Sequence, residues 1–246
     1  MRLKRAALLL IFLSMLSILS GTSTSLFSEP EIIVIEDFNK TGRAFFKDWK
    51  NMYSSDKSWN EYYLLSENGK TFLRGSTEKN PGLSIQIGKV VHNAWNIFTH
   101  PVISWEWRVH RIPAGGNESI SERNDSAAGL YILFQRKKIP LIGKKNQPVN
   151  WIKYVWSSTL PAGTVIPRKK VQSGVTLYEG RYVVVASGSK DLGKWLTFRR
   201  DVLSDYRNLF GSSPAANPIM IAFLTDSNVT KSSSVADYAN IAVRSY

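Results

Sequence analysis

The sequence predicts an all-β protein: a two-sheet β-sandwich of jelly-roll type with one or two short helices. Two patterns carry this prediction. Short segments in which apolar and polar residues alternate recur along the chain, as expected for strands with one buried face. Clusters of Gly, Pro, Asn and Ser separate them, and such clusters favour turns over helices. With 43% hydrophobic and 12% aromatic residues among 246, the chain can bury the core that two packed sheets enclose.

The predicted strands begin with EIIVIEDF at 31–38. A β-hairpin is expected at 60–75, because Asn68-Gly69 is a dipeptide that two-residue hairpin turns prefer. The other strand-like segments lie at 82–90, 101–112, 128–135, 151–158, 181–188, 219–226 and 235–245. No repeat or second boundary interrupts this series. We therefore expect a single β-sandwich domain over residues 26–246.

Helical features are confined to two segments. RAFFKDWKNM at 43–52 can form one or two turns. DVLSDYRNLFG at 201–211 has apolar residues near helical spacing and ends in a glycine. Asp201 is the expected N-cap of this second helix, since its side chain can accept a hydrogen bond from a free backbone N–H of the first turn.

The N-terminus has the three-part plan of a secretory signal. MRLKR is basic, residues 6–20 are mostly apolar, and GTSTS is small and polar. The apolar run is shorter than the roughly 20 residues that a membrane span needs. We predict a signal peptide at 1–25 and an exported, periplasmic protein, with an uncleaved anchor as the alternative. No later segment is long and apolar enough to span a membrane, so no span is expected after signal removal.

The chain is strongly basic, with a formal net charge of +13 and basic runs such as Arg136 to Lys138 and Arg168 to Lys170. An exported protein seldom meets nucleic acid, so no nucleic-acid partner is expected. Anionic glycans, lipopolysaccharide or lipid headgroups suit the compartment better. The alternative is a solvated basic surface with no specific partner. Cysteine is absent, which excludes disulfides, thiolate metal sites and a cysteine nucleophile.

The segment SWEWRV places two tryptophans two residues apart. In a strand, residues i and i+2 point to the same side, so Trp105 and Trp107 share a face with Ile103 and Val109. This apolar set predicts that both indoles belong to the core rather than to a ligand platform.

The opposite face of the same strand carries Glu106 and Arg108. If the strands at 128–135 and 151–158 are its neighbours, their outward residues complete one mixed face. We predict that this face binds a ligand, with these candidate residues: Glu106, Arg108, Tyr131, Trp151 and Lys153. Gly129 would leave room on it. The alternative is a solvated or loop-covered face with cross-strand ion pairs.

No catalytic set can be assigned. The three histidines lack ligand spacing, and the chain has no nucleophile elbow, no HExxH motif and no phosphate loop. We therefore predict a non-catalytic binding domain for a glycan or an anionic envelope component, without a cofactor. A structural calcium ion held by Glu36, Asp37 and Asp237 is an alternative, since hard cations take carboxylate oxygens. Two functional alternatives are a polysaccharide hydrolase or lyase using a carboxylate or a Tyr/Arg group on the same face, and a structural protein of the envelope.

Both ends of the chain resemble a galactose-binding-type jelly roll. IEDFNKTG…DW has the form of the opening strand of such modules, and DYANIAV has the form of their closing strand. This resemblance implies that the first and last strands lie close together.

A second resemblance covers residues 32–243. The ordered motifs are WEWRV, NDSAAGLYILFQ, IKYVWSS, VVVASG, KWLTFRRDVLSDYRNLFG and IAFLTDSNVTKSSSVADYANI. They resemble the bacterial family called domain of unknown function 3047. Its members are mostly exported and have no established activity, so the resemblance implies export but no reaction. The family pattern A-A-R-V-Y has an arginine where this chain has Gly129, which implies that a ligand contact at this position is changed or lost.

Overall fold

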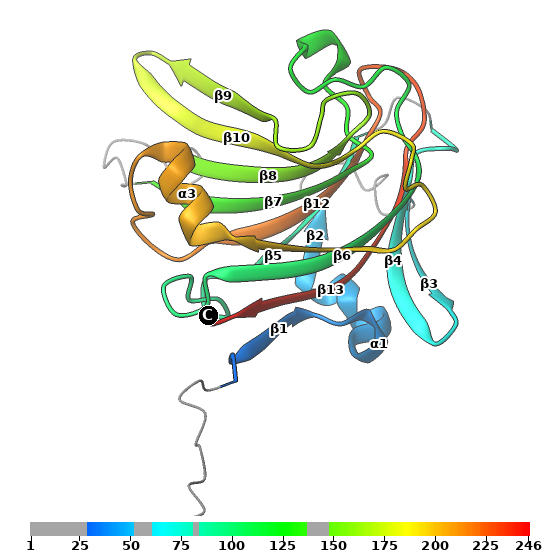
Figure 1. Cartoon of the computed structure of the whole chain (residues 1–246), viewed down its shortest axis with the longest axis horizontal. Coiled ribbons are helices and arrows are strands. Elements are labelled where there is room, and N and C mark those ends of the chain that lie inside the picture. The colour runs from blue at the N-terminus through cyan, green and yellow to red at the C-terminus, as the bar shows by residue number, and fades with distance from the viewer. Residues whose placement is uncertain (1–28, 52–60, 81–83, 137–147) are drawn as a thin grey trace, which may run out of the picture.

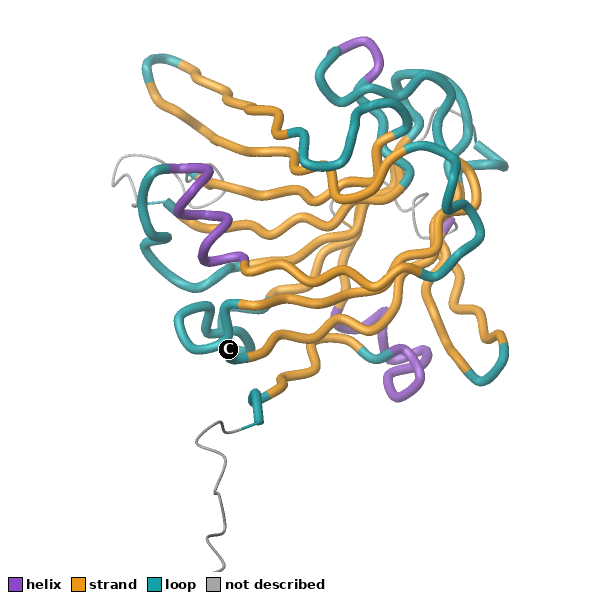
Figure 2. The backbone as a smooth tube through the Cα atoms, in the orientation of Figure 1, coloured by secondary structure: helices purple, strands orange, loops and turns teal. Residues whose placement is uncertain are grey.

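The computed structural model describes residues 29–51, 61–80, 84–136 and 148–246, and these form two packed β-sheets (Figures 1 and 2). Sheet A has the strand order β11 (Leu196–Asp201), β6 (Val102–Arg111), β13 (Val235–Arg244), β4 (Lys70–Ser76) and β3 (Tyr62–Glu67), with β1 (Ile32–Glu36) beside β13. Sheet B has the order β2 (Trp49–Asn51), β5 (Ser84–Val90), β12 (Met220–Asp226), β7 (Ala128–Gln135), β8 (Val149–Ser157), β10 (Val175–Ser187) and β9 (Val165–Gln172). The predicted all-β sandwich is confirmed.

The chain crosses repeatedly between the two sheets, as jelly rolls do. It passes from β5 in sheet B to β6 in sheet A and then back to β7 in sheet B. Strands that follow one another in sequence are therefore often on opposite layers. The first and last strands pair antiparallel, with Ile32 opposite Arg244, so their expected proximity is confirmed.

The core lies between the sheets and contains both tryptophans of SWEWRV. Trp105 and Trp107 are fully buried, which confirms their predicted place. The indole of Trp105 stacks on the ring of Tyr154 across the sandwich, at a centroid distance of 5.2 Å. This contact joins sheet A to sheet B.

The helices within the described ranges are short: α1 (Phe38–Thr41), α2 (Phe45–Asp48) and α3 (Val202–Phe210). Helix α3 confirms the predicted caps, because the Asp201 carboxylate accepts a hydrogen bond of 2.9 Å from Ser204 N and Gly211 is left-handed, with φ 72°. Its buried residues pack onto the core between the sheets. The one or two helical turns predicted at 43–52 are present as a 3-10 turn (Gly42–Ala44) followed by α2, but Trp49 already belongs to β2.

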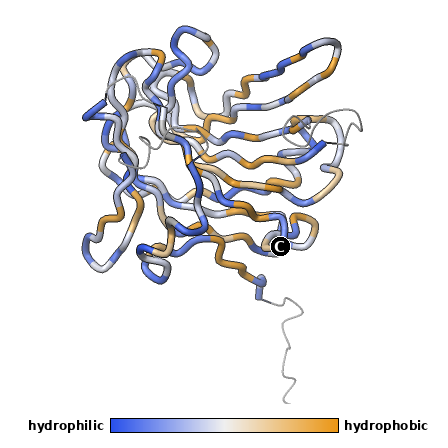
Figure 3. The backbone as a smooth tube through the Cα atoms, turned by 180° about the vertical axis from the view of Figure 1, so that it is seen from behind, coloured by the Kyte–Doolittle hydropathy of each residue, from blue (hydrophilic) through white to orange (hydrophobic). Residues whose placement is uncertain are grey.

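Strands β9 and β11 were not predicted, and β10 begins at Val175 instead of residue 181. The β9–β10 hairpin projects beyond the rest of sheet B (Figure 1) and carries the hydrophilic run Arg168 to Lys170 (Figure 3). No helix in the described ranges is long and apolar enough to cross a membrane. The predicted signal peptide at 1–25 lies outside the described residues, and the domain bounds remain a prediction.

Candidate ligand-binding face

The five predicted site residues do not share one face. Glu106 and Arg108 lie on β6 in sheet A, whereas Tyr131 lies on β7 and Trp151 and Lys153 lie on β8 in sheet B. Strands β7 and β8 are neighbours as expected, but β6 does not lie beside them, because it pairs with β11 and β13. The candidate residues therefore lie on two separate surfaces, one on each sheet.

On sheet A, the outer face is organised around Asp237. This buried carboxylate accepts hydrogen bonds from Arg74 at 2.6 and 2.9 Å and from Arg108 at 2.8 Å, and it lies 2.7 Å from His110 Nε2. Burial disfavours its charge, but these three partners outweigh burial and lower the pKa of Asp237. Asp237 therefore ties the last strand, β13, to Arg74 on β4 and to Arg108 and His110 on β6.

Glu106 and Arg108 already have partners on this face. Glu106 pairs with Lys70 and accepts a 3.1 Å hydrogen bond from Asn240. The Arg108 guanidinium also contacts Glu67 at 2.6 Å and lies 4.8 Å from the ring centre of Trp195. This is the cross-strand ion-pair arrangement that the sequence left as an alternative.

The structure does not bring the proposed calcium ligands together. The Glu36 carboxylate accepts a 2.7 Å hydrogen bond from Trp49 Nε1 and lies 3.2 Å from Lys89 Nζ. Asp37 caps helix α1. Asp237 is opposite Arg108 on β6, whereas Glu36 is opposite Ile241, further along β13. Each of the three carboxylates thus bonds to a separate set of protein groups.

On sheet B, the outer face gathers aromatic side chains from three adjacent strands. Tyr131, Lys153 and Tyr182 lie directly opposite one another across β7, β8 and β10. Two residues before Lys153 on β8, Trp151 lies opposite Gly180 of β10. We call this surface the aromatic face, and it consists of Tyr131, Trp151, Tyr178 and Tyr182, with Lys153 beneath it.

Trp151 lies flat against the backbone of β10 because position 180 has no side chain. A Cβ on Gly180 would lie 2.1–2.3 Å from ring atoms of the indole. The ring centres of Tyr131, Tyr182 and Tyr178 are 5.4, 5.3 and 6.0 Å from that of Trp151. The indole remains partly exposed, so one aromatic surface is backed by protein while contact with solvent is retained.

Cations border the aromatic face on the β9 side. Lys170 is opposite Tyr178, and Arg168 is opposite Gly180. The Arg168 guanidinium lies 5.3 Å from the ring centre of Tyr182 and donates to the backbone carbonyl of Glu118. Lys170 is exposed, and no ion-pair partner for it is found within the described ranges. The face therefore combines aromatic and cationic groups.

Lys153 is buried beneath this face, with 2% of its surface exposed. Its ammonium lies 5.2 and 4.8 Å from the ring centres of Tyr131 and Tyr182 and donates to Ser126 Oγ at 3.3 Å. Ser126 in turn donates to the buried Glu118 carboxylate at 2.9 Å. The prediction that Lys153 is a surface contact is therefore wrong, because aromatic rings and a loop enclose it.

Asp226 completes the buried polar group below the aromatic face. Burial raises the pKa of this carboxyl to about 6; the positive charge of Lys153 opposes the shift and the negative charge of Asp125 adds to it. Asp226 and Asp125 thus add buried carboxylates near the hydrogen-bonded chain of Lys153, Ser126 and Glu118.

The contribution of β9 and of the first half of β10 to this face was not predicted from the sequence. The relevant signal is LYEGRY, in which Tyr178, Gly180 and Tyr182 alternate and so share one face of a strand. Because the predicted strand began at residue 181, Tyr178 and Gly180 were not assigned to it. The basic run Arg168 to Lys170 beside it was noted for its charge alone and was not assigned to a strand.

The fold and this face define a β-sandwich protein with an aromatic and cationic surface on one sheet. Residues 47–242 match the family model described as "Protein of unknown function (DUF3047)". This match covers most of the chain, so the chain belongs to that family. A comparison with curated proteins finds no match.

Several solved structures are similar in their overall arrangement. A family 11 carbohydrate-binding module from Clostridium thermocellum, in complex with a β-1,3-1,4-mixed-linked tetrasaccharide, is 14% identical, with 86% of this chain and 94% of that chain covered and a TM-score of 0.42. The mannan-recognising module TmCBM27 is 9% identical, with 88% and 99% covered and a TM-score of 0.36. A cellulase derived from Cel12A of Rhodothermus marinus is 9% identical, with 88% and 100% covered and a TM-score of 0.40. At these values the comparisons carry no information on the ligand of this chain.

Proposed function

We propose that this protein is an exported, non-catalytic binding domain whose aromatic face holds an anionic glycan of the cell envelope. The observation that carries the proposal is the indole of Trp151, laid flat on Gly180 and still partly exposed. A flat, supported aromatic surface is suited to stack on the C–H face of a sugar ring, and its rigidity keeps the entropy cost of binding small.

The cations of β9 favour an acidic ligand. Lys170 is exposed and lies opposite Tyr178 on the neighbouring strand, and Tyr178 in turn is next to Trp151. A lysine attracts a carboxylate, phosphate or sulfate group as a point charge. The full chain has a net charge of +13, of which Arg2, Lys4 and Arg5 of the predicted signal contribute three positive charges. The remaining positive charge attracts polyanions in general, and salt screens this attraction.

Binding is tested on a glycan array and then by titration with an oligogalacturonide and a neutral oligosaccharide of equal length. Trp151→Ala should weaken binding of the preferred glycan at least about tenfold, as expected when a stacking surface is lost. Trp195→Ala is the matched control, because Trp195 lies beside Phe72 on sheet A, with ring centres 5.5 Å apart, and should leave binding unchanged. Lys170→Ala should weaken binding of the acidic glycan alone.

The proposal fails if the wild-type protein binds none of the acidic glycans on the array. It also fails if Trp195→Ala and Trp151→Ala weaken binding equally. Release of shortened glycan chains by the wild-type protein would contradict the non-catalytic role and would favour the hydrolase or lyase alternative.

A further inference from the structure

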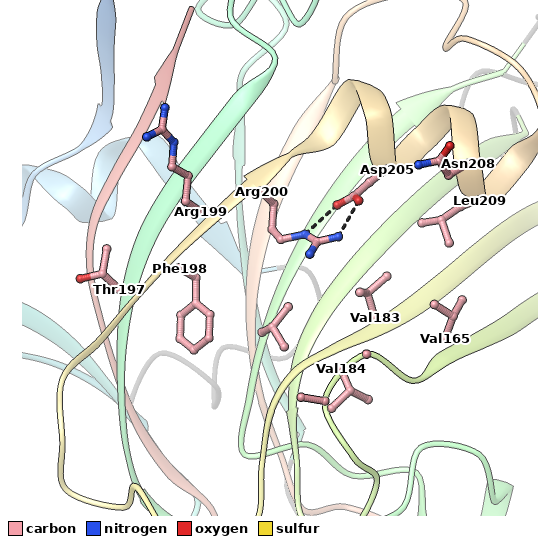
Figure 4. Close-up of a pocket in the computed structure, with 13 residues that line it drawn as sticks. Val165, Val183, Val184, Thr197, Phe198, Arg199, Arg200, Asp205, Asn208 and Leu209 are labelled. Atoms are coloured by element: carbon pink, nitrogen blue, oxygen red, sulfur yellow. Dashed lines mark hydrogen bonds and ion pairs between the residues drawn. The ribbon is translucent and has the colours of Figure 1, made fainter. Parts of the chain in front are cut away.

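A cleft of about 680 Å³ opens between the two sheets, away from the aromatic face. Figure 4 shows strand β11 on one side of it and the inner face of β10 with the start of β9 on the other, while α3 closes one end. Val165, Val183 and Leu209 contribute apolar walls. Four consecutive residues of β11, from Thr197 to Arg200, line the cleft, so the edge of that strand faces it.

Strand β11 is at the end of sheet A and pairs only with β6 among the described strands. Val202 N donates to Pro101 O at 2.8 Å, which sets the alternation of the antiparallel ladder. Residues an even number of positions from Val202 bond to β6, and the residues between them direct their N–H and C=O groups to the other side. The backbone groups of Thr197 and Arg199 therefore point into the cleft.

Strand β9 has a proline that β11 lacks. It is one of the two outer strands of sheet B and contains Pro167, followed by the exposed Lys169 and Lys170. A proline and charged side chains are the usual means of preventing a further strand from pairing with a sheet edge. The β11 sequence LTFRRD contains no proline, so each of its residues retains a backbone donor.

The side chains around the cleft indicate what an added strand would carry. Arg199 points out of the sandwich (Figure 4), is exposed, and has no ion-pair partner within the described ranges. On β6, the residue opposite Arg199 is Ser104, to which Arg244 donates a hydrogen bond of 3.4 Å. A residue paired with Arg199 would share this cationic side, whereas the residues on either side of it would face the valines and Leu209.

The ion pair inside the cleft is already satisfied. Arg200 donates to both oxygens of Asp205, at 2.9 and 2.5 Å, and Tyr154 Oη donates to the same carboxylate at 2.6 Å. Besides the Arg199 side chain, the backbone of β11 offers hydrogen-bonding groups at the cleft. Backbone pairing suits an extended polypeptide better than a compact small molecule.

We propose that this cleft accepts an extended peptide segment of a partner protein, which adds to β11 as a further strand of sheet A through the backbone of Thr197 and Arg199. The segment has an acidic residue opposite Arg199 and apolar residues on either side of it. This is strand addition, in which main-chain hydrogen bonds give affinity and alternate side chains give selectivity. The proposal is independent of glycan binding on the aromatic face.

The test uses the full chain and a fluorescent, acetylated and amidated eight-residue peptide of alternating valine and glutamate. We expect one peptide to bind per chain. N-methylation of the alternate amides that face β11 should weaken binding by about tenfold or more, since each methyl removes a main-chain donor. Methylation of the other alternate set of amides, which face away from β11, should have a much smaller effect. A peptide with lysine in place of glutamate should bind about tenfold more weakly.

Variants of the protein give a second test. Arg199→Pro removes the N–H that faces the cleft and no bond to β6, so it should abolish binding, whereas Arg199→Ala, which keeps the N–H, should weaken it only severalfold. Both variants should bind the glycan of the aromatic face as the wild type does, which separates the two proposals. Equal binding of both methylated peptides would overturn the proposal, even if Arg199→Pro does not fold. Dimerisation through β11 in place of peptide binding would overturn it too, since the occupant would be a second copy.

Discussion

Lys153 fills the space beside Gly129: a Cβ on Gly129 would lie 2.6 Å from Lys153 Cε. The glycine therefore does not open room for a ligand, as the sequence led us to expect, but accommodates a lysine from the neighbouring strand. The resemblance to the family implies an arginine at position 129. In this chain a cation occupies the same part of the sheet, but β8 supplies it.

This pairing predicts coupled effects on stability. Gly129→Ala should lower the free energy of unfolding by about 1–3 kcal/mol, because the enclosed lysine has to shift. In a Lys153→Ala background the same change should cost close to nothing, since the contact is gone. Urea unfolding of the four proteins measures the coupling. An equal cost in both backgrounds would mean that the backbone, and not Lys153, disfavours a side chain at position 129.

Asp237 should be the most sensitive charged residue of sheet A. Asp237→Asn keeps the shape but removes the charge that balances Arg74 and Arg108, so we expect a loss of about 3–5 kcal/mol. Glu106→Gln serves as the control on the same face. Its pair with Lys70 is partly exposed, so the expected loss is about 0–1 kcal/mol. Comparable losses in the two variants, measured by chemical unfolding, would contradict this ranking.

Asp226 should make the protein less stable as the pH rises from about 4 to 6. Its pKa is raised from 3.8 to about 6 in the native state, so in this window the native state keeps a proton that the unfolded state has lost. The unfolding free energy therefore falls with rising pH, by up to about 3 kcal/mol across the window. Asp226→Asn should remove this component. If the difference in stability between wild type and variant is the same at pH 4 and pH 7, Asp226 does not titrate as expected.

The sequence predicts which face of a sheet a side chain occupies better than it predicts which strands lie side by side. Alternation along one strand is a local property, and it correctly assigned Trp105 and Trp107 to the core. The pairing of strands depends on crossings between sheets that leave no local signal, so Arg108 was grouped with Trp151 although they lie on different sheets. Gly180 had no evident role in the sequence, because its role depends on an indole from another strand. Three of the five candidate residues do share a face, and the strand that completes it was recognised only in part.

Gly180 offers the most direct test of how the aromatic face is built. Gly180→Ala places a methyl group where indole carbons of Trp151 now lie, so the ring must leave the surface of β10. We expect a loss of about 1–3 kcal/mol in unfolding free energy, a change in the near-ultraviolet circular dichroism, and loss of glycan binding to the extent seen for Trp151→Ala. The double variant Gly180→Ala/Trp151→Ala should be no less stable than Trp151→Ala alone, because the added methyl then has no ring to displace. If the methyl group lowers stability equally with and without the indole, the glycine serves the strand itself and not the placement of Trp151.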